Sequence, residues 1–135
     1  RQEKGNTVID ETVVAKIAGI ASREVAGVYA MGNAARRAFN SLTERIPGSQ
    51  TNVSGGISVE KGERQTAIDA TIIIDYGASV VDVANAIRRN VIQSVEQSTG
   101  LEVVEVNIAV SDVHLPDDDA PSGSNSATGG SAELA

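Results

Sequence analysis

Residues 66–113 read TAIDATIIIDYG (66–77), ASVVDVANAIRRNVIQSVEQSTG (78–100) and LEVVEVNIAVSDV (101–113), and they specify most of the architecture. The first and last parts alternate apolar and polar residues, which is typical of half-buried strands. The middle part repeats apolar residues at helical spacing, and Ser79 begins an S-x-x-D capping box. A strand, a helix and a strand in this order predict a parallel strand pair with a right-handed crossover.

The helical part is expected to end near Ser98 and to bury one apolar stripe, made of Val80, Val83, Ala84, Ile87, Val91 and Val95. Every second residue of the two flanking strands is expected to face the core, namely Ile68, Ala70, Ile72, Ile74, Tyr76, Val104, Val106, Ile108 and Val110. The opposite face of the sheet carries Thr71, Ile73 and Asn107. Since that face mixes polar and apolar residues, we expect it to be open and at least partly wet.

A second helix is predicted over residues 11–26, with Gly27 at its end. Its apolar stripe comprises Val13, Val14, Ile17, Ala21, Val25 and Val28, with Ile20 beside it. Small residues that include Ala15, Gly19 and Ser22 cluster on the opposite side of this helix. We expect this ridge either to face solvent or to receive a partner. The partner interpretation stays open because glycine weakens a helix, so the helix propensity of alanine does not explain Gly19.

A hairpin precedes residue 66, since residues 56–60 alternate as a strand does and residues 61–64 read as a turn. The predicted fold is therefore a two-layer α/β (α+β) sandwich, in which a mixed sheet of three to four strands carries two main helices on one face. Residues 7–9 are a candidate short edge strand. If they form one, the order matches a ferredoxin-like split topology, and this alternative stays open. The single folded domain is expected to cover residues 5–115.

The segment between the first helix and the hairpin is ambiguous. Residues 35–46 are a candidate short helix with Arg36, Arg37 and Arg45 near its polar side, and residues 48–56 read as a mobile loop. The three arginines are candidates for contact with lipid headgroups, an acidic partner or the acidic tail of the chain. A solvated polar face is the alternative interpretation.

Acidic residues are concentrated at the end of the chain. The net charge is −7, and residues 116–135 hold four of the 18 acidic residues and no Lys or Arg, so the rest of the chain carries −3. Their Ser-, Gly- and Ala-rich composition predicts a disordered acidic tail. We interpret Asp117, Asp118 and Asp119 as a solvated charge run and not as a calcium or magnesium site. A nearly neutral body disfavours broad nucleic-acid binding.

No sequence pattern indicates catalysis. The chain has no cysteine and one histidine, His114, which follows Asp112 by two residues without a nucleophile placed by any motif. The common phosphate-binding and metal-binding motifs are absent as well. We therefore expect no enzyme activity and no cofactor. The sequence shows neither the roughly 20-residue apolar run of a membrane span nor a signal peptide, which predicts a cytoplasmic protein.

Several short motifs, taken in order, resemble the alkaline shock protein family of bacteria. They are VAGV (25–28), IIIDYG (72–77), TGL (99–101) and VEVNI (104–108). Similar motifs recur in that family in the same order, and the similarity covers residues 5–113. The arginine-bearing linker before the hairpin is longer here than in many family members.

The resemblance implies a non-enzymatic protein of cell-envelope stress and homeostasis that acts as a scaffold through protein–protein contacts. Its partners would be a membrane-embedded anchor or other proteins, or further copies of itself, and it would be peripheral at the inner face of the cell membrane. The candidate interaction surface comprises Ala15, Gly19, Ser22, Thr71, Ile73, Asn107, Arg36, Arg37 and Arg45. The family contributes no catalytic residues. The alternative is a small nucleic-acid-binding module with a KH-like two-layer fold, although the G-x-x-G clamp of that fold is missing.

Overall fold

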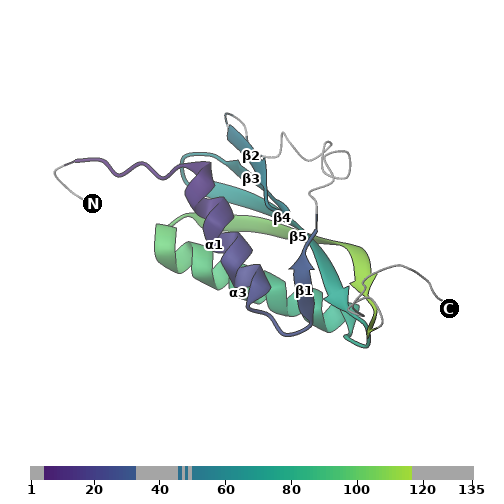
Figure 1. The fold of residues 1–135 in the computed structure, drawn as a ribbon. Coiled ribbons are helices and arrows are strands. Elements are labelled where there is room, and N and C mark those ends of the chain that lie inside the picture. The colour runs from purple at the N-terminus through teal and green to yellow at the C-terminus, as the bar shows by residue number, and fades with distance from the viewer. Residues whose placement is uncertain (1–4, 33–45, 47, 49, 117–135) are drawn as a thin grey trace.

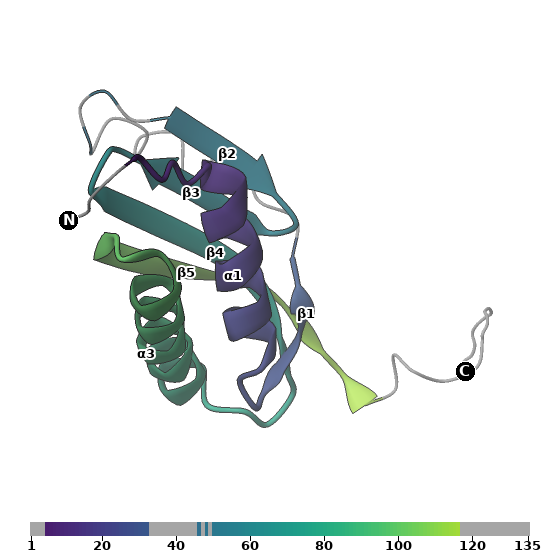
Figure 2. The same ribbon diagram turned by 90° about the vertical axis from the view of Figure 1, so that its left-hand side faces the viewer.

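The computed structural model describes residues 5–32, 46, 48 and 50–116, and Figure 1 shows their arrangement. In chain order the elements are α1 (Glu11–Arg23), β1 (Val28–Met31), β2 (Gln50–Ser54), β3 (Ile57–Lys61), β4 (Gln65–Asp75), α3 (Val80–Thr99) and β5 (Glu102–His114). The two described helices lie side by side on one face of the sheet, with α1 over the middle strands and α3 nearer β5 (Figure 2).

The long strand β4 organises a sheet of five described strands. β5 pairs with β4 in parallel along its whole length, as the strand–helix–strand pattern predicts. β3 and β1 both pair with β4 in antiparallel orientation, β3 with its first half and β1 with its second half. Since β5 occupies one edge of β4, β3 and β1 must share the other edge, end to end. β2 then pairs with β3 at the outside.

Two glycines allow β1 and β3 to meet on that shared edge. The Gly32 N–H donates to the Thr71 carbonyl at 2.8 Å, and the Thr71 N–H donates to the Gly56 carbonyl at 2.8 Å. A Cβ added to Gly56 would lie 2.5 Å from the Gly32 oxygen, and the φ angle of Gly56 is +84°. Both the space and the left-handed conformation therefore require glycine at position 56.

The predicted fold class is confirmed, but several element boundaries are wrong. The sheet has five described strands instead of three or four, because residues 28–31 and 50–54 are strands and not part of a helix or a loop. Residues 7–9 form no strand, so the first strand of a ferredoxin-like arrangement is missing. Each missed strand is short and lies at an edge, where sequence periodicity is too brief to be read.

The helix α3 agrees closely with its prediction. The Ser79 hydroxyl accepts the Asp82 N–H at 3.3 Å, and Gly100 ends the helix in the left-handed conformation. The stripe of Val83, Ile87, Val91 and Val95 is buried as expected.

Three side chains predicted for the core are exposed instead. Val80 is 47% exposed at the first residue of α3, and Tyr76 is 68% exposed directly after β4, which ends at Asp75. Val104 is 41% exposed because the pairing of β5 with β4 shifts register between Val103 and Glu105. A bulge of this kind interrupts the alternation of side chains along a strand. Val103 packs against the core in place of Val104.

The helix α1 buries more of its surface than the predicted stripe: Val14 and Ala21 of that stripe are buried, and Ile17, Val25 and Val28 pack against the core, but the small residues on the other side are buried as well. Its buried residues are Val14, Ala15, Ala18, Gly19, Ala21 and Ser22. By contrast Ile20 is 52% exposed and Val13 is 44% exposed. The predicted ridge of small residues therefore faces the sheet and is not a solvated face, and the most deeply buried side of the helix is displaced from the predicted stripe by roughly the 100° of one residue.

The physical reason is the bulk of the sheet side chains beneath α1. The buried face of β3 and β4 consists mainly of isoleucine and valine, namely Ile57, Val59, Ile68, Ile72 and Ile74. A helix packs closely on such a surface when its own contact residues are small. Ser22 is compatible with this burial because its hydroxyl donates to the Ala18 carbonyl at 2.8 Å.

The packing of α1 predicts opposite outcomes for two neighbouring substitutions. Ala18→Leu would overpack a fully buried position and is expected to lower the free energy of unfolding by about 1–3 kcal/mol or more. Ile20→Lys places a charge on a half-exposed position and is expected to cost less than about 1 kcal/mol. Urea unfolding of both variants measures the difference, and a larger loss for Ile20→Lys would contradict this orientation of α1.

Candidate functional site

The sheet face opposite the helices is less open than the sequence predicts. Thr71 is only 1% exposed, and Ser58, Glu60 and Asp69 on the same face are also buried. The expectation of a wet face that includes Thr71 is therefore wrong. Ile73 and Asn107 of the predicted surface are partly exposed, and their role in binding stays a prediction.

The polar groups on this face are joined by hydrogen bonds across the strands. The Asn107 Nδ2 donates to Asp69 Oδ1 at 2.9 Å and to Glu105 Oε2 at 2.6 Å. The Ile46 N–H donates to Glu60 Oε2 at 2.9 Å. Hydrogen bonds of this kind offset the loss of water around a buried carboxylate. Within the described residues, no group of three or more acidic, histidine or cysteine side chains could hold a metal ion.

The other predicted surface residues are placed as follows. Ala15, Gly19 and Ser22 are buried on the inner side of α1. Arg36, Arg37 and Arg45 lie outside the described residues, as do residues 35–45 of the candidate helix at 35–46 and the acidic tail from residue 117.

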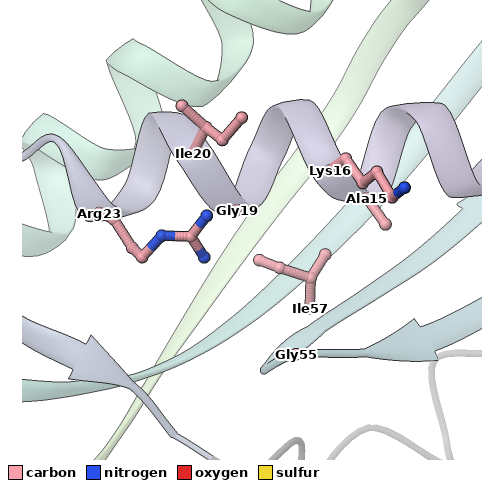
Figure 3. A pocket seen from close by; sticks show the side chains of 7 residues that line it. All are labelled: Ala15, Lys16, Gly19, Ile20, Arg23, Gly55 and Ile57. Carbon is pink, nitrogen blue, oxygen red and sulfur yellow. The ribbon is translucent and has the colours of Figure 1, made fainter.

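A groove runs beside α1, on the side away from α3 (Figure 3). Its volume is about 290 Å³, and it lies between α1 and the tight turn that joins β2 to β3. Its lining residues are Ala15, Lys16, Gly19, Ile20, Arg23, Gly55 and Ile57. Sequence reasoning missed this groove because it depends on the turn at Gly55 lying opposite the helix.

β4 and β5 end, and β1 and α3 begin, toward one end of the molecule in the view of Figure 1. The exposed residues of these four segments are a second candidate surface. We call it the strand-end patch, and its exposed apolar side chains are Tyr29, Tyr76, Val80, Val81, Val113 and Leu115. His114 joins these segments, since its ring stacks on Tyr29 with centroids 3.7 Å apart and its carbonyl accepts the Tyr76 N–H at 3.0 Å. Both tyrosines of the chain are therefore at this patch.

Asp112 and His114 each make a local contact at the end of β5. The Asp112 Oδ1 accepts the N–H of Val113 at 2.8 Å, which fixes it locally. The histidine ring is stacked on Tyr29 at an interplanar angle of 10°. These contacts give both residues a structural role at the end of β5.

The architecture defines the chain as a small two-layer α+β domain whose accessible features are a groove and an apolar patch. The sequence matches the alkaline shock protein 23 family, described as having a cell envelope-related function, over residues 1–115, and the chain belongs to this family. The resemblance to the alkaline shock proteins is thereby confirmed, and with it a cell envelope-related family function. Among the described helices, none is long and apolar enough to cross a membrane.

Individual relatives agree with this assignment. The chain is 30% identical over 110 residues to a stress response regulator gls24 homolog of Streptococcus pyogenes, a match that covers 82% of this chain and 59% of that protein. It is 32% identical over 115 residues to the uncharacterized protein YloU of Bacillus subtilis, covering 85% and 93% of the two chains. The chain thus spans only part of the length of the streptococcal relatives. No solved structure matches it significantly.

The buried hydroxyl of Thr71 gives a test of the sheet face. Its Oγ1 has no hydrogen-bond partner among the described residues, whereas the Thr66 Oγ1 donates to the Glu60 carbonyl at 3.1 Å. Since an unpaired buried hydroxyl destabilises the fold, Thr71→Val is expected to raise the free energy of unfolding by about 1 kcal/mol.

Thr66→Val is the matched control, because it removes a satisfied hydroxyl at an equally buried position. It is expected to lower the free energy of unfolding by about 1 kcal/mol. Denaturant unfolding measures both variants. A loss of similar size in the two would mean that the Thr71 hydroxyl is in fact hydrogen-bonded.

Proposed function

We propose that this chain is a non-enzymatic scaffold of the cell-envelope stress response, and that it works by binding other proteins. The family supports the envelope and stress context. The protein-binding role is supported by the strand-end patch, which is the observation that carries the proposal.

The strand-end patch supports partner binding because it exposes both tyrosines of the chain, whereas the buried core cluster of the described residues contains no aromatic side chain. Aromatic residues make up only 2% of the chain, yet Tyr29 is 48% exposed and Tyr76 is 68% exposed. A tyrosine presents a large, rigid and amphipathic surface, and such side chains often dominate the energy of protein interfaces. Val81 extends the patch onto α3 and is 67% exposed.

We further propose that the protein acts in the cytoplasm, at the inner face of the cell membrane, and that a membrane-embedded partner holds it there. Binding of further copies of the chain through the same patch is the second form that a scaffold would take. The alternative of a KH-like nucleic-acid module has no support in the comparisons, and the net charge of −7 disfavours it.

Cell fractionation with chemical crosslinking tests this proposal. The wild-type protein is expected in the envelope fraction, crosslinked to a partner or to itself. Tyr76→Ser combined with Val81→Ser removes two largely exposed apolar side chains and is expected to reduce the crosslinked and envelope-bound fraction at least about tenfold, as loss of a hot spot would.

Val8→Ser combined with Val13→Ser is the matched control, since both residues are exposed and lie outside the patch. Both double variants are expected to unfold near the wild-type transition, because exposed positions contribute little to stability. A wild-type protein that forms no crosslink and stays in the soluble fraction would contradict the scaffold proposal. Equal losses in the two double variants would contradict the assignment to the strand-end patch.

A further inference from the structure

The groove beside α1 has an apolar floor between two cationic side chains. Ala15, Gly19 and Ile57 form the floor, and Lys16 and Arg23 lie along the exposed side of the helix. Lys16 and Arg23 are seven residues apart, which places their Cα atoms roughly 10 Å apart along the helix axis. Figure 3 shows the Arg23 side chain extending back beside the helix toward Gly19.

The glycine at position 19 keeps this floor open. A Cβ added there would lie 3.4 Å from the Arg23 Nη1 and 3.8 Å from the Ile57 Cγ1, so it would fit without a clash. Packing therefore does not require a glycine, although glycine weakens a helix by about 1 kcal/mol relative to alanine. The missing side chain leaves room beneath the guanidinium group.

The charged side chains that line the groove are all positive. None of its lining residues is acidic. Neither the Lys16 nor the Arg23 side chain makes a hydrogen bond or an ion pair within the part of the chain that the structure describes. Two unpaired cations on a chain with a net charge of −7 favour a local anionic ligand.

We propose that this groove binds an acidic peptide segment of a partner protein. One aliphatic side chain of the segment lies on the floor formed by Ala15, Gly19 and Ile57, and a carboxylate on each side of it pairs with Lys16 or Arg23. The volume of about 290 Å³ suits a few side chains and not a folded surface. A membrane surface is disfavoured as the occupant, because lipid recognition uses clusters of about four to eight cations.

This inference rests on the proposed function, since it states the chemistry of one partner contact. The proposed function and the groove proposal can nevertheless fail separately. The scaffold experiment measures crosslinks and fractions in cells, whereas the groove is tested by titrating the purified full chain with a defined peptide.

The probe is a fluorescein-labelled peptide of sequence GSESLESGS, in which two glutamates flank a leucine at a spacing of roughly 10 Å in an extended chain. Fluorescence anisotropy is expected to show saturable binding below about 1 mM that weakens as salt is added. The peptides GSQSLQSGS and GSESSESGS lack the charges or the leucine, and each is expected to bind at least about fivefold more weakly.

Lys16→Glu combined with Arg23→Glu is expected to weaken binding of GSESLESGS at least about tenfold, because both attractive pairs become repulsive. Arg64→Glu combined with Arg89→Glu is the matched control, since it makes the same change in net charge at exposed positions outside the groove. This control is expected to change the affinity less than about threefold.

Results of three kinds would overturn the proposal. The first is no saturable binding of GSESLESGS to the wild type, or equal weakening by the two double variants. The second is stronger binding of a peptide of residues 116–135, which would assign the groove to the acidic tail of the chain itself. The third is binding to phosphatidylglycerol vesicles that depends on Lys16 and Arg23 while the peptide does not bind.

Discussion

Close contact between α1 and the sheet sets the arrangement of the other elements. The sheet contributes large branched side chains such as Ile57, Ile68 and Ile72, and the helix contributes Ala18 and Ser22. Because the aliphatic bulk comes from the sheet, the core is filled without aromatic rings. The same contact fixes the rotation of α1, and this rotation places Lys16 and Arg23 beside the groove.

The shared edge of β4 imposes a second restriction on the chain. β3 and β1 meet there only because Gly32 and Gly56 let three stretches of backbone approach one another around Thr71. The arrangement directs β1 toward the end of the sheet, where Tyr29 stacks on His114. The strand-end patch therefore follows from the same junction that buries Thr71, since both depend on how β1 continues the line of β3.

The functional picture combines family membership with these two surfaces. The chain belongs to a family with a cell envelope-related function. The strand-end patch offers aromatic and aliphatic surface, and the groove offers paired cations around a small apolar floor. Because the two surfaces differ in chemistry, the proposed scaffold would bind a different partner segment at each of them. This is the property that a scaffold requires.

Local sequence patterns were sufficient to predict the fold class, the parallel strand pair, the capped helix α3 and the family. Each of these depends on periodicity or on short motifs in order, which a single chain displays directly. Three features required the folded chain: the buried side of α1, the strand at residues 50–54 and the exposure of Tyr76. A helix with apolar residues on one side and small residues on the other can bury either side. The bulk of the surface beneath it selects the side, and that surface comes from strands distant in the sequence.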